Sequence, residues 1–402
     1  LTRDYLVAQA TAVVDAPAAK KTYERIAARL EVIDDKALLA NIMSALGRQE
    51  AIAGNQAAAA DLYGKCLDIA DAARRDNVAA MCATEVARAS LLGGKPKEVV
   101  DAAVVDAKRR IERGGKSRAV QKHLNDVLAS VAYSRGEIDE AIRFQEQSVA
   151  EERADRTSLS NLALALNNLG AYLETAGRYQ DAMNAFREAR DVKAQIPGRG
   201  NDGHRWLLTA NIVWIQSELG LHRDARAEAE GLLKLADQYG DKLYAIISHS
   251  FLANLLIADG ERERGLALIE RALAFVSKRK LEEAVDALEI YRQAGLAYIA
   301  VGNLPEAQRM VDRLFASATH YFAPEAANWM SYQLLAGKLA AARGDAAKAR
   351  TAYQAALALA KGRTFYQGWV AEAKLGLAEA LPASEKATAR TLAAEAHAEL
   401  AP

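Results

Sequence analysis

Cysteine and proline are scarce in this chain, and each scarcity excludes a class of structure. Cysteine occurs only at Cys66 and Cys82 in 402 residues, which is too few for a disulfide framework and lacks the CxxC spacing of metal or redox sites. We therefore expect both to be small buried apolar residues. Only seven prolines occur, and alternating β-branched runs are few. The sequence therefore predicts helices nearly throughout.

An excess of charge of either sign is also missing. Lys and Arg together number 52, and so do Asp and Glu, so nothing drives general attraction to nucleic acid or to an anionic membrane. No apolar run approaches the ~20 residues of a membrane-spanning helix, and no signal peptide opens the chain. We expect no membrane span and a cytoplasmic location. The first residue is Leu1 rather than Met, which suggests an excised domain or a processed product.

Catalytic and metal-binding motifs are lacking as well. The six histidines show no HxH or HExxH spacing, and neither a Gly-x-Ser-x-Gly elbow nor a phosphate loop occurs. Gly198, Gly200 and Gly203 have the letters of a dinucleotide fingerprint, but a helical segment precedes them where that motif needs a strand, so we expect a loop between repeats. The sequence predicts no enzyme, no cofactor and no metal. An enzyme built as a closed α/α barrel is a distant alternative. Such a barrel closes after six or seven helical hairpins, whereas the glycine series described next indicates eight.

What the sequence does contain is a regular series of glycines. Each glycine is followed five residues later by a small residue, as at Gly177 and Ala182. Successive glycines lie 40, 42, 41, 43, 40, 42 and 42 residues apart, at Gly54, Gly94, Gly136, Gly177, Gly220, Gly260, Gly302 and Gly344. A fixed period of this size in a helical sequence indicates stacked helical hairpins, with a left-handed glycine turn inside each hairpin.

A second set of glycines lies within the predicted first helix of a hairpin. Gly170 belongs to this set, and the same position is occupied in other hairpins by Gly47, Gly295 and Gly337. A glycine inside a helix is unfavourable by about 1 kcal/mol relative to alanine, so it usually reports a close approach of backbone. We expect the missing Cβ to let the second helix of the hairpin approach.

The combined pattern resembles the tetratricopeptide repeat. That family has Leu-Gly and a large residue in the first helix, then Ala, an aromatic residue and Ala in the second. The matching residues here are Leu169, Gly170, Leu173, Gly177, Ala182, Phe186 and Ala189, with Leu46, Gly47, Ala59 and Tyr63 and with Ala336, Gly337, Ala349, Tyr353 and Ala356 as further copies. The closing proline is mostly missing, and the period is about 41 rather than 34 residues. The sequence is therefore most similar to the long-repeat branch, which includes kinesin light chain and bacterial peptide-sensing regulators.

This resemblance implies the fold class and the domain organisation. We expect an all-α, right-handed superhelical solenoid of about eight helical hairpins with capping helices. Residues 1–35 are predicted to form an incomplete first hairpin, residues 36–361 eight repeats of about 41 residues, and residues 362–402 a degenerate last hairpin.

The resemblance also implies a binding face. In the family, the first helix of each hairpin lines the concave side, with ligand-facing positions about six, nine and ten residues before the turn glycine. Carried over residue by residue, these positions give a candidate site for protein or peptide that comprises Asn167, Asn168, Asn211, Trp214, Asn254, Arg292, Arg88 and Arg48. An Asn amide both donates and accepts hydrogen bonds, so it pairs with peptide backbone of any sequence, and Trp214 offers an apolar anchor. The alternative is that the asparagines bond neighbouring helices and that Trp214 is core.

The resemblance therefore implies a scaffold whose concave face binds a protein or an extended peptide. The competing interpretation is a ligand- or peptide-sensing regulatory domain of a larger signalling protein, with its effector domain elsewhere in the same full-length protein. A basic run that contains Arg109, Arg110 and Arg113 precedes Gly114. Positive charge at a helix C-terminus complements the macrodipole, and a docking patch for an acidic partner is the alternative.

Overall fold

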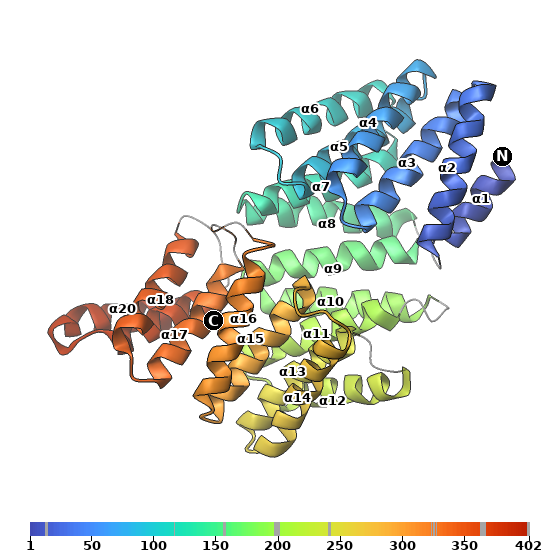
Figure 1. The fold of residues 1–402 in the computed structure, drawn as a ribbon. Coiled ribbons are helices and arrows are strands. Elements are labelled where there is room, and N and C mark those ends of the chain that lie inside the picture. Colours follow the sequence, from blue (N-terminus) through green and yellow to red (C-terminus); the bar gives the residue numbers. More distant parts are fainter. Residues whose placement is uncertain are drawn as a thin grey trace. The chain divides into compact units, whose positions relative to one another are not determined.

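The computed structural model consists of helices joined by short turns across its described residues (Figure 1). It describes residues 1–12, 15–115, 117–155, 158–196, 202–239, 243–322, 324, 326, 328–361 and 367–399, so the predicted loop at Gly198 and Gly200 lies outside the described residues. These residues form twenty α-helices and one short 3-10 helix, and they contain no strand. The expected all-α fold of repeated hairpins is confirmed.

Contacts divide the chain into two compact units, Leu1–Asp155 and Arg156–Pro402. The first unit contains eight helices among its described residues. They are α1 (Thr2–Thr11), α2 (Ala16–Ile33), α3 (Lys36–Ile52), α4 (Gln56–Ala72), α5 (Asp76–Leu92), α6 (Lys97–Arg113), α7 (Arg118–Ser134) and α8 (Ile138–Asp155).

The second unit continues the same arrangement of helices in antiparallel pairs. Its helices are α9 (Leu159–Thr175), α10 (Tyr179–Ala194), α11 (Asp202–Glu218), α12 (His222–Tyr239), α13 (Leu243–Ala258), α14 (Arg262–Lys278), α15 (Val285–Ala300), α16 (Leu304–Ala318), α17 (Trp329–Ala342), α18 (Ala346–Ala360), α19 (Gln367–Ala380), η2 (Ala383–Glu385) and α20 (Lys386–Glu399). The predicted boundaries at residues 35 and 361 stay a prediction.

The eight periodic glycines turn the chain between the helices of a pair. All eight have positive φ, from +65° at Gly94 to +90° at Gly260. At Gly177 the glycine N–H donates to the Glu174 carbonyl and the next N–H to the Leu173 carbonyl, both at 2.9 Å. This pair of bonds satisfies the last carbonyls of the first helix, and it needs a left-handed residue that glycine adopts most readily.

The glycines inside the first helices admit a ring from the second helix. A Cβ built on Gly170 would lie 2.6 Å from Cε1 of Phe186, and a Cβ on Gly47 would lie 2.8 Å from Cε1 of Tyr63. The predicted close approach within the hairpin is thereby confirmed at Gly170 and Gly47. Gly295 differs, because its nearest neighbour is Leu335, on the first helix of the next hairpin.

The small residue five positions after each turn glycine is buried in most hairpins, as at Ala59 and Ala182. The pair of Gly94 and Val99 differs, because Val99 is exposed and Val100 is buried instead. The reason is local. Pro96 is the N-cap of α6, so this helix begins one residue later relative to its glycine than α10 does, whose N-cap is Arg178.

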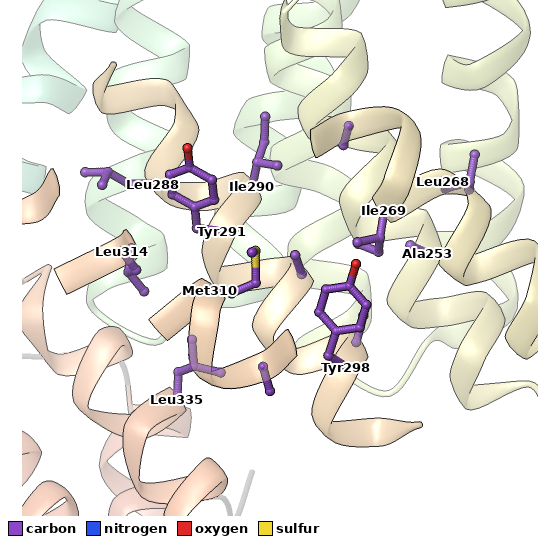
Figure 2. Close-up of a cluster of buried hydrophobic side chains, with 14 of the residues drawn as sticks. Ala253, Leu268, Ile269, Leu288, Ile290, Tyr291, Tyr298, Met310, Leu314 and Leu335 are labelled. Atoms are coloured by element: carbon purple, nitrogen blue, oxygen red, sulfur yellow. The ribbon is translucent and has the colours of Figure 1, made fainter. Parts of the chain in front are cut away.

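The largest core of the second unit runs through several consecutive hairpins (Figure 2). Tyr291 and Tyr298 of α15 lie in one cluster with aliphatic side chains of α14, α16 and α17, which also contains Met310. Each helix therefore buries side chains against both its hairpin partner and the next hairpin, as expected of a repeat array.

The two cysteines are buried as expected, and they are paired with each other. Cys66 of α4 and Cys82 of α5 form a disulfide with a Cα–Cα distance of 6.1 Å, and both are fully buried. Sequence reasoning leaves the pairing open, because the residues lie 16 positions apart in two helices, a separation that has no motif. Among the described residues, no helix has the length and apolar composition needed to cross a membrane.

Candidate functional site

In each unit most first helices of successive hairpins pack on one another and form an inner layer, whereas α9 and α11 both pack against α10, which lies between them in sequence. In the second unit α11 contacts α13, α13 contacts α15, and α15 contacts α17. On α9, α11 and α13, the positions nine and six residues before the turn glycine are only partly covered. We call these six residues the inner stripe: Asn168, Ala171, Asn211, Trp214, Phe251 and Asn254. Their helical neighbours Leu166, Ile212 and Leu252 are buried, so the stripe is the side of these helices that the core leaves partly open.

In the residues that the structure describes, Asn168 and Asn211 make fewer hydrogen bonds than Asn254, the third asparagine of the stripe. Asn167 Nδ2 donates to Asn168 Oδ1 at 3.4 Å, and Asn167 Oδ1 is buried and accepts no hydrogen bond. Within the described part of the chain, no bond satisfies the side chain of Asn211. The predicted pair Asn168 and Asn211 thus keeps hydrogen-bonding capacity for a ligand.

Trp214 is half-buried rather than part of the core. Its ring meets that of Tyr179 edge-on, with centroids 6.2 Å apart and planes at 72°. The core tryptophan of the same helix is Trp206, which is only 2% exposed. Tyr179 therefore orients an indole that keeps part of its surface open.

Other predicted residues of the second unit are already engaged within the fold. Asn254 Nδ2 donates to Gln293 Oε1 at 2.8 Å and to the Gln293 carbonyl at 3.1 Å, so this amide joins α13 to α15. Arg292 pairs with Glu289 one turn earlier, at 2.6 Å. The helix-contact interpretation therefore fits Asn254 better than it fits Asn168 or Asn211.

In the first unit, Arg88 belongs to a charged cluster with Glu85 and His123. Glu85 and Arg88 lie nine and six residues before Gly94, and Arg48 lies six before Gly54. His123 Nε2 lies 2.8 Å from Glu85 Oε1, and Arg88 Nη2 lies 3.4 Å from His123 Nδ1. Sequence reasoning missed Glu85 and His123, although the nine-residue position would have identified Glu85.

The electrostatics of this cluster favour an ionised Glu85. Burial raises the pKa of this carboxyl, whose side chain is 14% exposed. The close contact with His123 and the charges of His123, Arg88 and Arg48 outweigh burial and lower the pKa of Glu85 to about 2. A carboxylate held among basic groups stays charged at neutral pH.

The basic run before Gly114 is used to join neighbouring hairpins. Arg110 Nη1 lies 2.5 Å from Asp71 Oδ2, and Arg113 pairs with Asp71 at 2.8 Å and with Asp76 at 3.0 Å. These bridges connect α6 to α4 and to the start of α5, so two of the three arginines already have acidic partners. Among the described residues, no group of three or more His, Cys, Asp or Glu side chains is arranged to hold a metal ion.

Comparisons with known proteins agree with this geometry. A family model described as tetratricopeptide repeat matches residues 121–195. The solved structure of the apo form of RapI has 11% identity and a TM-score of 0.63, and covers 90% of this chain and 98% of its own. A Rap protein complexed with Competence and Sporulation Factor has 13% identity and a TM-score of 0.59, with coverages of 91% and 97%.

A third solved structure extends the same likeness. The Rap conjugation gene regulator of the plasmid pLS20, in complex with the Phr* peptide, has 12% identity, a TM-score of 0.59 and coverages of 86% and 94%. No curated protein sequence matches this chain. At these identities the likeness is one of fold. The periodic glycine turns and the buried rings opposite Gly47 and Gly170 agree with the matched model, so the chain has the fold of a tetratricopeptide-repeat array, with the family model itself matched over residues 121–195.

Proposed function

We propose that this chain binds an extended segment of a protein partner along the inner stripe of α9, α11 and α13. The observation that carries the proposal is the register of the stripe. Asn168 and Asn211 lie nine residues before successive turn glycines, and Trp214 lies one turn beyond Asn211. A strand-like peptide crossing α9 and α11 meets the same polar position on each of these two first helices, and the corresponding position on α13 is the apolar Phe251.

The chemistry of the stripe suits peptide backbone rather than one fixed side chain. An Asn amide pairs with both the N–H and the C=O of a peptide group. A half-buried indole supplies apolar area at low entropic cost, which is why Trp is enriched among the residues that dominate binding energy. Two of the structures with this fold hold the Phr* peptide and Competence and Sporulation Factor, respectively, which supports a peptide as the ligand class here.

The test begins with selection of binding peptides from a random display library on the full chain, and then measures their affinity for variants. Asn211→Ala and Trp214→Ala should each weaken binding by roughly tenfold or more, because an unpaired peptide group costs about 1–3 kcal/mol and a lost aromatic anchor about 2 kcal/mol. Asn184→Ala on the exposed side of α10 is the matched control and should bind like the parent. If both stripe variants bind with parent-like affinity at unchanged melting temperature, the peptide binds to another surface of the chain.

The stripe also fits a second interpretation, in which the chain is the sensing domain of a larger signalling protein with its effector domain outside these residues. The full gene sequence separates the two, because a sensing domain requires an appended effector. In either case we propose a cytoplasmic, non-catalytic binding protein that requires no cofactor, and turnover by the isolated chain would contradict this.

A further inference from the structure

A hollow lies on the side of α11 opposite the inner stripe. At 100° per residue, Thr209 and Gln216 lie on the face of α11 opposite Asn211 and Trp214. They line a hollow of about 590 Å³ together with side chains of the two flanking helices α10 and α12. We call it the outer hollow, and its polar lining residues are Arg187, Arg190, Thr209, Gln216, Asp224 and Glu228.

Gln216 brings an unsatisfied acceptor to this hollow. Its side chain is 2% exposed, and its Oε1 accepts no hydrogen bond. Buried polar groups in folded proteins are nearly always paired, and an orphan among them calls for a partner. A ligand with an N–H donor supplies that partner.

Of the four charged side chains that line the hollow, two pair with each other and two have no charged partner among the described residues. Arg190 Nη1 lies 2.9 Å from Glu228 Oε2, so this pair joins α10 to α12. Arg187 on α10 and Asp224 on α12 form no ion pair or hydrogen bond with any described residue. The hollow therefore presents an open guanidinium on one wall and an open carboxylate on the other.

We propose that the outer hollow binds a free α-amino acid in its zwitterionic form. The carboxylate of the ligand pairs with Arg187, whose planar fork suits bidentate contact. The ammonium group donates to Asp224 and to Gln216 Oε1, and the side chain lies against Ala227 and Leu232 of α12. The lining contains two arginines and two carboxylates, so it does not favour phosphates or other ligands with large net charge.

The orphaned acceptor and the two unpaired charges of opposite sign are absent from a comparable hollow elsewhere in the described residues. An equivalent hollow of about 700 Å³ between α16, α17 and α18 is lined by Phe315, Phe322 and Trp329. None of its lining residues is an orphaned buried polar group among the described residues. The orphan and the open pair of opposite charges are what distinguish the outer hollow.

The experiment titrates the full chain with each common L-α-amino acid singly and follows thermal unfolding and heat of binding. A ligand that binds only the folded state raises the melting temperature. We expect at least one amino acid to do so, whereas its decarboxylated amine and its N-acetyl derivative should not, because each lacks one of the two charges. Arg187→Met should weaken binding by roughly tenfold to a hundredfold.

Two further variants keep the proposal falsifiable. Arg223→Met removes an exposed arginine of α12 that does not line the hollow, and it should bind the amino acid like the parent. Gln216→Met removes the orphaned oxygen and should weaken amino-acid binding in a chain that still folds, because the orphan has no partner to lose. The proposal is overturned if no amino acid shifts unfolding, if the amine or the N-acetyl derivative binds equally well, or if Arg187→Met retains parent affinity. Trp214→Ala tests the inner stripe separately, and it should leave amino-acid binding unchanged.

Discussion

Glu85 is an acidic residue whose protonation is tied to folding of the first unit. Its pKa falls from an ordinary 4.5 to about 2 because the His123 contact and the charges of Arg88 and Arg48 outweigh burial. A group whose pKa is lower in the folded state stabilises the fold above its unfolded pKa and loses that contribution as pH falls toward the folded value. The stabilisation from Glu85 should therefore be complete above pH 4.5 and decline toward pH 2.

We predict that Glu85→Gln lowers the free energy of unfolding at pH 7, and that the gap to the parent narrows below about pH 4.5. The shift corresponds to stabilisation on the order of 3 kcal/mol. Urea unfolding of both proteins between pH 7 and pH 3 measures it. Glu98→Gln, at an exposed position of α6, is the control and should follow the parent. A gap that stays constant across this range would show that the pKa of Glu85 is not depressed.

Within a hairpin, contact between the two helices depends on glycine at the crossing point. We predict that Gly170→Ala destabilises the chain by about 1–3 kcal/mol, because the new Cβ would lie 2.6 Å from Phe186 and force the ring or the helix to move. Thermal or urea unfolding measures the loss, and Phe186→Leu in the same chain should recover part of it.

The matched control for this substitution has the opposite expected sign. Gly231 in α12 has nothing within 4 Å of an added Cβ, so Gly231→Ala should raise stability by about 0.5–1 kcal/mol through helix propensity alone. If Gly170→Ala behaves like Gly231→Ala, the close approach of Phe186 is not a constraint on the hairpin.

At the scale of the helical hairpin, most of the fold can be predicted from the sequence, because the hairpin turn is formed by residues close together in the chain. Gly54 through Gly344 specify positive φ at fixed spacing, and each leaves a signal that depends only on neighbouring residues. Side-chain partners between hairpins leave no such signal. Arg110 meets Asp71 from 39 positions away, and Asn254 meets Gln293 across the same separation. Whether a polar residue faces a ligand or a neighbouring helix therefore depends on the offset between hairpins, which the period alone does not give.

For the whole molecule, the division into two compact units limits how far a local change spreads. In a repeat array each hairpin contacts only its neighbours, so stability is close to a sum of local terms. The Cys66–Cys82 disulfide joins α4 and α5 and lies wholly inside Leu1–Asp155. Its loss should therefore weaken that unit and leave Arg156–Pro402 nearly unaffected.

We predict that reduction of the disulfide, or the paired change Cys66→Ala with Cys82→Ala, lowers the stability of the first unit by roughly 3 kcal/mol, the value that loop-closure entropy gives for a loop of about 15 residues. Hydrogen exchange followed peptide by peptide measures this, because protection reports the opening free energy of each region. Amides of α4 and α5 should exchange faster, while those of α15 and α16 keep their parent rates. An equal loss of protection in both units would show that the chain unfolds as one cooperative body. The same measurement bears on the proposed cytoplasmic location, because cytosolic thiols are held reduced. In that compartment Cys66 and Cys82 would be unpaired, and the first unit would have the lower stability of the reduced form.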